Sequence, residues 1–264
     1  MSDASARSPL GTETPTPAHV VWHDLECGGY RVDLALWHEL AVRAGGPILD
    51  VGAGTGRVSL DLARRGHAMT AVDIDAVLLQ SLRARAAGLG LEIETICADA
   101  RSFDLERRDF ALCIAPMQTV QLLGGAAGRV AFLRGAREHL RESATIACAI
   151  LTDVEPFDCA LGSAGPAAER AHVDGRLFLS RAVRVSELAD GVEIERDRRV
   201  IDERPATRGD GAQPPPERNL IKLDRVDATE LERDAREAGL RALARHEVAA
   251  TDEHVGSVVV VLGV

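Results

Sequence analysis

The chain has 264 residues, of which 46 % are hydrophobic, and a formal net charge of −10. These values are typical of a globular protein with one domain and an elaboration, long enough to bury a sizeable core. The acidic balance, without a basic stretch interleaved with aromatic residues, argues against a nucleic-acid partner, because a surface that binds a phosphate backbone needs the opposite charge.

The N-terminal segment 1–20 is rich in Ser, Thr, Pro and Ala, and is expected to be a disordered tail. It lacks the basic start and apolar centre of a signal peptide, and no apolar run in the chain is long enough to span a membrane, so a cytoplasmic protein without a membrane partner is expected. The five cysteines are scattered and never spaced as CxxC, which predicts neither a disulfide framework nor a zinc site.

The predicted elements then alternate between helix and strand. An amphipathic helix is expected over 21–44, where Leu34, Trp37, His38 and Ala41 recur at helical spacing. Strands are expected at 47–51, 68–74, 91–97, 109–115 and 144–151, with helices at 55–66, 75–88 and 126–140. Apolar strands alternating with helices indicate an α/β fold with a doubly wound, mainly parallel sheet, because both faces of each strand must be dry.

The pattern changes after residue 152. Two antiparallel strands are expected on either side of 188–191, followed by an exposed loop at 208–219 and a third strand at 220–227. A helix at 228–240 and two closing strands complete a seven-stranded Rossmann-like sheet. The expected organisation is a core over 21–152, an antiparallel β insertion over 153–227 and closing elements over 228–264. The insertion follows the fifth strand, at the sheet edge where ligands of such folds lie, so it is a hypothetical lid.

A glycine-rich turn, DVGAGTGR (50–57), follows the first strand and precedes a helix. Glycine can adopt unusual dihedral angles and lets a ligand approach the main chain closely. The dinucleotide fingerprint G-x-G-x-x-G is not matched, because the third glycine comes one residue early and Arg57 stands in its place. Asp50 would repel a pyrophosphate but suits a cationic group such as the ammonium of an amino acid.

Two more acids stand at the ends of the following strands. Asp73 closes the second strand, where a carboxylate can accept from both hydroxyls of a ribose, a feature that fits NAD equally well. Asp99 follows the third strand, where it could accept from an adenine amino group while Ala100 presents its backbone N–H to the ring. Together with Asp50, these acids favour a nucleoside ligand with a cationic tail.

In this order, the motifs ILDVGAGTGR, AVDI and CADA resemble those of the class I S-adenosylmethionine-dependent methyltransferases, over residues 45–152. The resemblance implies S-adenosyl-L-methionine as cofactor and methyl transfer by in-line displacement at the sulfonium. By position, it implies that the methionine part contacts Asp50, Gly52, Ala53, Gly54, Thr55 and Gly56, the ribose Asp73, the adenine Ile74, Asp99 and Ala100, and the sulfonium Ala115. Tyr30 is a candidate to cover the methionine end, with core packing as the alternative.

The methyl acceptor is expected to be a small molecule, bound between 117–123 and the insertion and contacted by Met117, Gln118 and Gln121. The sequence APMQ (115–118) lacks the Asn/Asp-Pro-Pro-aromatic pattern of amino-methylating nucleic-acid enzymes. Asp153, Glu155 and Asp158 lie in a polar loop, and no metal is expected there. No convincing catalytic signature is present; His172 is a candidate base, with an ordinary surface histidine as the alternative.

A small-molecule methyltransferase is therefore the favoured function, and two alternatives stay open. One is a nicotinamide-dependent oxidoreductase on a similar sheet, against which Asp50, Arg57 and the lack of a Tyr-x-x-x-Lys pair count, since Lys222 is the only lysine. The other is a non-catalytic S-adenosylmethionine-binding module. The sequence does not specify whether N, O or C is methylated, and it leaves open whether the chain forms a homodimer.

Overall fold

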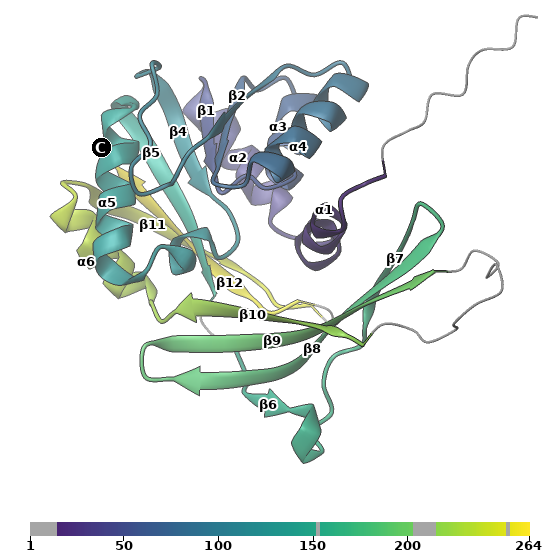
Figure 1. Ribbon diagram of the computed structural model, residues 1–264. Coiled ribbons are helices and arrows are strands. Elements are labelled where there is room, and N and C mark those ends of the chain that lie inside the picture. Colours follow the sequence, from purple (N-terminus) through teal and green to yellow (C-terminus); the bar gives the residue numbers. More distant parts are fainter. Residues whose placement is uncertain (1–14, 152–153, 203–214, 252–253) are drawn as a thin grey trace, which may run out of the picture.

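The computed structural model describes residues 15–151, 154–202, 215–251 and 254–264. Its larger sheet has seven strands in the order β11-β12-β5-β4-β1-β2-β3. The neighbouring pairs from β3 to β5 are all parallel, whereas β12 runs antiparallel to both β5 and β11. The predicted doubly wound, mainly parallel sheet is thus confirmed, with helices on both of its faces (Figure 1).

The helices and strands of this layer follow the predicted order along the chain. The strands are β1 (Ile48–Val51), β2 (Met69–Asp73), β3 (Ile93–Cys97), β4 (Phe110–Ala115), β5 (Leu140–Leu151), β11 (Arg241–Val248) and β12 (Ser257–Gly263). The helices are α1 (Ala18–His23), the π-helical turn η1 (Asp24–Gly28), α2 (Leu34–Ala44), α3 (Arg57–Arg64), α4 (Ala76–Gly88), the short η2 (Thr119–Leu122), α5 (Gly125–Glu138) and α6 (Ala228–Glu237).

Successive side chains of each core strand pack against opposite helical layers. On one face of β4, Cys113 belongs to a cluster with Phe132 of α5 and Leu231 of α6. On the other face, the next residue, Ile114, packs in a cluster with Trp37 of α2. Because side chains alternate along a strand and both faces are covered, the strand reads in the sequence as an unbroken apolar run. No helix within the described ranges is long and apolar enough to cross a membrane.

A second, antiparallel sheet follows β5 in the chain, with the strand order β10-β9-β8-β6 and with β7 paired to β8. Its elements are β6 (Phe157–Asp158), the short η3 (Cys159–Leu161), β7 (Glu169–Val173), β8 (Arg176–Leu188), β9 (Gly191–Asp202) and β10 (Glu217–Asp224). The predicted hairpin around 188–191 is the β8–β9 pair. Figure 1 shows α1 between this sheet and the core, where Trp22 stacks edge-on against Phe178 of β8 with 5.0 Å between ring centroids.

The helix expected over 21–44 is broken, and Asp33 explains why. Its buried carboxylate accepts from the Arg57 guanidinium at 2.5 and 2.8 Å and from the Trp37 indole at 2.7 Å. Arg57 also donates to the carbonyl of Tyr30 at 2.8 Å, so the connection between η1 and α2 is tied to α3 instead of continuing as helix. The ion pair between Asp33 and Arg57 therefore interrupts the helix that the spacing of apolar residues predicted.

The predicted tail and the predicted loop each have a boundary that differs in the structure. The predicted tail, 1–20, is wrong for its last residues, because α1 begins at Ala18; residues 1–14 lie outside the described ranges. Of the predicted loop, 208–219, residues 208–214 lie outside the described ranges, and Glu217 already begins β10. Glu217 pairs with Arg198 of β9, so the second sheet extends further along the chain than the alternation of apolar residues indicated.

Candidate functional site

A cavity of about 460 Å³ lies at the carboxyl ends of β1, β2, β3 and β4. Residues at the end of each of these strands or just after it contribute to its wall, namely 50–53, 73–74, 98–101 and 116–119. Further wall residues come from α1 and η1, through His19, His23, Glu26 and Cys27, and from the second sheet, through Arg198 and Ile221. Arg57, Val58, Val72, Leu78, Leu122 and Leu123 complete the lining. Its size is within the range of pockets that hold small molecules.

The cavity brings together many of the residues that the sequence singled out. Those on its wall are Asp50, Gly52, Ala53, Asp73, Ile74, Asp99, Ala100, Met117 and Gln118. Those outside the wall are Tyr30, Gly54, Thr55, Gly56, Ala115, Gln121 and His172. The three acids at three successive strand ends therefore face one space, as their positions in the sequence predicted.

The glycine turn is required by the packing of the protein itself. Gly52 and Gly54 have φ angles of +75° and +54°, which other residues adopt with strain. A Cβ atom at Gly52 would lie within 3.0 Å of the Thr119 side chain, and one at Gly54 equally close to the imidazole of His23. The expected neighbour of these glycines was a ligand, whereas at Gly54 the neighbour is His23.

Asp50 is a buried carboxylate with one unsatisfied oxygen. Its Oδ2 accepts from the Ser59 hydroxyl at 2.6 Å, whereas Oδ1 is buried and has no partner among the described residues. Burial raises the pKa of Asp50 to about 6, because the charged form loses its hydration. A buried acceptor of this kind is costly unless a donor reaches it, so the Oδ1 atom indicates a place for a ligand's cationic or N–H group.

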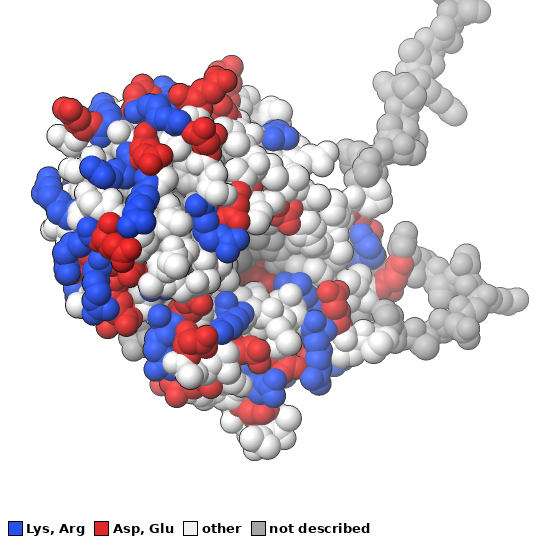
Figure 2. All heavy atoms as spheres, turned by 60° about the vertical axis from the view of Figure 1, so that its left-hand side comes forward, with Lys and Arg blue, Asp and Glu red and all other residues white. Residues whose placement is uncertain are grey.

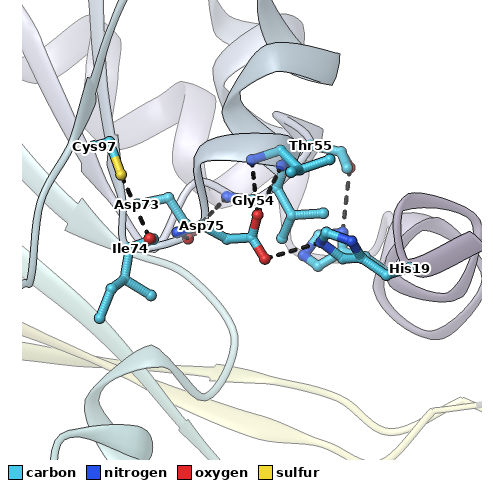
Figure 3. A network of polar contacts seen from close by, with 10 residues as sticks. His19, Gly54, Thr55, Asp73, Ile74, Asp75 and Cys97 are labelled. Atoms are coloured by element: carbon cyan, nitrogen blue, oxygen red, sulfur yellow. Dashed lines mark hydrogen bonds and ion pairs between the residues drawn. The ribbon is translucent and has the colours of Figure 1, made fainter. Parts of the chain in front are cut away.

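Asp73, at the end of β2, is held by two backbone donors. Its Oδ2 accepts from the N–H of Gly54 at 2.7 Å and its Oδ1 from the N–H of Asp75 at 2.8 Å. Figure 3 shows this carboxylate beneath the glycine turn, with Ile74 directed away from it. Since a carboxylate offers about four acceptor positions, Asp73 retains acceptor capacity for hydroxyl groups of a ligand in the cavity.

Asp99 is on the wall but is already paired. Its carboxylate accepts from the Arg101 guanidinium at 2.6 Å and from the Arg101 backbone N–H at 2.8 Å. These hydrogen bonds lower the pKa of Asp99 to about 2. A ligand's amino group would share this acceptor with Arg101, which the sequence analysis did not foresee.

Three predicted site residues have other surroundings than expected. Tyr30 is buried outside the cavity, with the Arg57 guanidinium 5.3 Å from its ring centroid, which agrees with the alternative of core packing. The Gln121 amide binds the main chain of Leu151: it accepts from the N–H at 2.7 Å and donates to the carbonyl at 3.1 Å. His172 is exposed on β7, so it has no position on the wall from which to take a proton.

Ala115 and Met117 mark the end of β4 at the cavity. Ala115 is fully buried and the wall begins at the next residue, Pro116. Met117 has a φ of +55°, a left-handed conformation that is uncommon for a residue other than glycine. Strain of this kind concentrates at functional sites, where the surrounding structure holds it.

One part of the site is absent from the predicted site residues: the segment formed by α1 and η1, which we call the N-terminal strap (residues 18–28). At one end, the imidazole of His19 meets the carboxylate of Asp75 at 2.9 Å, as Figure 3 shows. At the other end, Glu26 accepts from both the Nε and the Nη2 of Arg198, at 2.8 and 2.7 Å. Arg198 lies 172 residues further along the chain, and no local pattern in the sequence announces this pair.

The Glu26–Arg198 pair is nearly buried, with side-chain exposures of 8 % and 13 %. Burial alone would raise the pKa of Glu26, but hydrogen bonds from Arg198 and Ser180 hold it below its ordinary value, so the carboxylate stays charged. Beside it on the wall, burial raises the pKa of Cys27 to about 11, which leaves a protonated thiol and no nucleophile at neutral pH.

The surface charges are mixed. On the face drawn in Figure 2, basic and acidic side chains of the described residues are interspersed, without a broad field of either sign. A field of positive charge is what a protein needs to bind a phosphate backbone. Within the described ranges, no three His, Cys, Asp or Glu side chains are grouped closely enough to hold a metal ion; Asp153 lies outside those ranges.

Residues 48–143 match the family described as a methyltransferase domain. Uncharacterized proteins of Mycobacterium tuberculosis and Mycobacterium bovis are 39 % identical over 69 residues, a stretch that covers 26 % of this chain and 25 % of theirs. The chain thus spans about a quarter of the length of the curated relatives that it matches.

Solved structures match over nearly the whole chain. An S-adenosylmethionine-dependent methyltransferase from Clostridium acetobutylicum has a TM-score of 0.66 at 14 % identity, covering 94 % of this chain and 97 % of that one. CalS10 of Micromonospora echinaspora, an amino pentose methyltransferase solved with S-adenosylmethionine bound, has a TM-score of 0.66 at 20 % identity and coverages of 92 % and 96 %. The sugar N-methyltransferase KedS8 of a Streptoalloteichus species has a TM-score of 0.68 at 14 % identity and coverages of 99 % and 98 %.

At these identities the likeness to solved structures concerns the fold, whereas the family match concerns the sequence of the core. The structural likeness and the family match both agree with the three acids at the strand ends and with the strand order of the sheet. Residues 48–143 thus match a methyltransferase domain, and the chain has the fold of the class I S-adenosylmethionine-dependent methyltransferases.

Proposed function

We propose that this protein binds S-adenosyl-L-methionine in the cavity and transfers its methyl group to a small-molecule acceptor. The observation that carries the proposal is Asp50, whose buried Oδ1 has no partner among the described residues and stands at the cavity wall. The ammonium of the methionine part is a donor of matching charge for this atom. A bound ammonium would also favour the ionised form of Asp50 and so oppose burial, the largest cause that raises its pKa to about 6.

The other cofactor contacts follow the strand ends. Asp73 retains acceptor capacity for the ribose hydroxyls, and Ile74 offers an apolar surface to the adenine, since its side chain is 69 % exposed at the wall. The Ala100 backbone N–H and the Asp99 carboxylate bind the edge of the adenine, and Arg101 donates to the same carboxylate. These residues supply acceptors and apolar surface, which suits a nucleoside with a cationic tail better than a pyrophosphate.

The acceptor occupies the part of the cavity between β4 and the second sheet. Met117 and Gln118 line it from the core, and Arg198 and Ile221 line it from β9 and β10. When bound, the cofactor supplies a methyl group already activated by its sulfonium. The work of the chain is therefore to orient the acceptor and exclude water, and the second sheet and the N-terminal strap are the elements that close the space.

Titration calorimetry tests the cofactor. We expect heat of binding with S-adenosylmethionine and S-adenosylhomocysteine and none with NAD; binding of NAD alone would overturn the proposal in favour of an oxidoreductase. Asp73→Ala should weaken the binding of S-adenosylhomocysteine by at least about tenfold, the scale of a hydrogen bond to a charged group. Unchanged affinity in a folded Asp73→Ala variant would remove this carboxylate from the site.

A methyl-transfer screen tests the acceptor. Two of the similar structures are described as methyltransferases of an amino pentose and of sugar nitrogen, so amino sugars are the first candidates to test, followed by small metabolites from a cell extract. The readout is transfer of a labelled methyl group that requires the protein and the cofactor. Tight cofactor binding with no transfer to any acceptor would favour the alternative of a non-catalytic binding module.

A further inference from the structure

His23, the last residue of α1, is seated on the glycine turn. Its imidazole lies so close to Gly54 that a Cβ atom there would come within 3.0 Å of the ring Nε2. The N–H of the same Gly54 donates to the carboxylate of Asp73. His23 and Asp73 thus meet at one residue, the first at its Cα and the second at its nitrogen, and both line the cavity.

A chain of hydrogen bonds determines the tautomer of His23. Hydrogen bonds from Arg85 and Thr55 outweigh burial and hold the pKa of Asp24 below its ordinary value, so this carboxylate is a charged acceptor. Thr55 has one hydroxyl proton and directs it to Asp24, with 2.7 Å between the oxygens. The Thr55 oxygen can then only accept from Nδ1 of His23, 3.3 Å away.

With the proton on Nδ1, a neutral His23 has its lone pair on Nε2. Burial lowers the pKa of His23, and this effect exceeds the opposite influence of its neighbours Asp24, Asp73 and Glu26, so the ring is neutral at pH 7. Arg85, the basic group facing it, acts in the same direction as burial. His23 makes its hydrogen bond to Thr55 through Nδ1, whereas the edge formed by Nε2 and Cε1 lies beside Gly54.

We infer that His23 is a cofactor-binding residue, whose Nε2 accepts a hydrogen bond from a ribose hydroxyl beside the carboxylate of Asp73. The inference rests on the proposed function. Each carboxylate oxygen of Asp73 accepts one backbone N–H and retains one further acceptor position, and a second acceptor beside it allows the two hydroxyl protons of a ribose diol to go to separate groups. An acceptor pair made of Asp73 and neutral His23 matches free hydroxyls and repels a ribose phosphate, so the cavity selects a nucleoside with an unmodified diol.

The test is a cycle of calorimetric titrations of the whole chain with S-adenosylhomocysteine and with its 2′-deoxy and 3′-deoxy analogues. Each of the two deoxy analogues should bind the unchanged protein about three- to tenfold more weakly, the scale of one hydrogen bond, and the informative one is the analogue that lacks the hydroxyl bound to His23. His23→Ala should lose a similar factor with S-adenosylhomocysteine and lose nothing further with that deoxy analogue. His23→Gln, which can present a carbonyl oxygen near the position of Nε2, should recover part of the affinity.

His67→Ala is the control, because His67 stands outside the cavity wall, where its ring meets that of His38. This variant should show the same deoxy penalty as the unchanged protein. Equal deoxy penalties with and without His23 would overturn the inference, even if His23→Ala lowered affinity by loosening the strap or lowered turnover. If the unchanged protein failed to bind S-adenosylhomocysteine at all, the proposed function itself would fall.

Discussion

Replacing Gly54 by Ala measures how closely the N-terminal strap is packed on the glycine turn. Gly54 has a φ of +54°, and a non-glycine residue held in this region costs about 1–2 kcal/mol. The new methyl group would also overlap the imidazole of His23. Forcing a packed ring aside adds about 1–3 kcal/mol, so the expected loss in the free energy of unfolding is about 3 kcal/mol.

Urea unfolding followed by circular dichroism gives this quantity, and the chain provides a matched control. Gly45, the C-cap of α2, has a φ of +59°, and a Cβ there would meet nothing within 4 Å. Gly45→Ala therefore carries the dihedral strain without the overlap, and should cost about 1–2 kcal/mol. The difference between the two variants isolates the contact with His23.

A third variant removes the imidazole. In a His23→Ala background, Gly54→Ala should cost no more than Gly45→Ala does, because only the backbone strain is left. The reasoning would be refuted if Gly54→Ala and Gly45→Ala were equally destabilising in the unchanged background. It would also be refuted if the excess cost of Gly54→Ala persisted without the ring.

Three further predictions concern buried polar groups. Burial raises the pKa of Asp50 from 3.8 to about 6, so between these pH values the native state holds a proton that the unfolded chain has lost. The free energy of unfolding of the unchanged protein should therefore fall by up to ~3 kcal/mol from about pH 4 to 6 and stay level above, when it is compared with that of Asp50→Asn. Arg198→Ala leaves Glu26 buried without its bidentate partner and should cost about 3 kcal/mol in urea unfolding. Gln121→Leu should lower the free energy of unfolding by about 1–3 kcal/mol, because the backbone N–H of Leu151 loses its acceptor. The affinity for S-adenosylhomocysteine should stay unchanged.

Each of these has an outcome that contradicts it. A pH profile of stability that is the same in Asp50→Asn would mean that the carboxyl is not buried as described. The control for Arg198→Ala is Arg43→Ala, which removes an exposed pair with Glu39 and should cost less than about 1 kcal/mol; equal losses would show that the buried pair contributes little. Lost affinity with full stability in Gln121→Leu would return Gln121 to the site.

The sequence alone was sufficient for the core sheet. Apolar runs of strand length separated by amphipathic helices identify β1 to β5 and their crossovers, because a strand covered on both faces has no polar side to show. It was also sufficient to bring three acids to one cavity wall. Asp50, Asp73 and Asp99 stand at the ends of strands that run parallel in one sheet, so their positions along the chain already bring them to one edge.

Only the tertiary structure decided what closes the cavity. Arg57 binds Asp33 and ends the expected helix, and Arg198 reaches Glu26 from 172 residues away. His23 becomes a wall residue because the strap folds back over Gly54. Periodicity and turn residues report the conformation of neighbours in the chain, whereas these pairs depend on how two sheets and a strap are placed in space. For that reason the sequence determined the side of the cavity where the cofactor is proposed to bind, and the tertiary structure alone determined the opposite side, proposed for the acceptor.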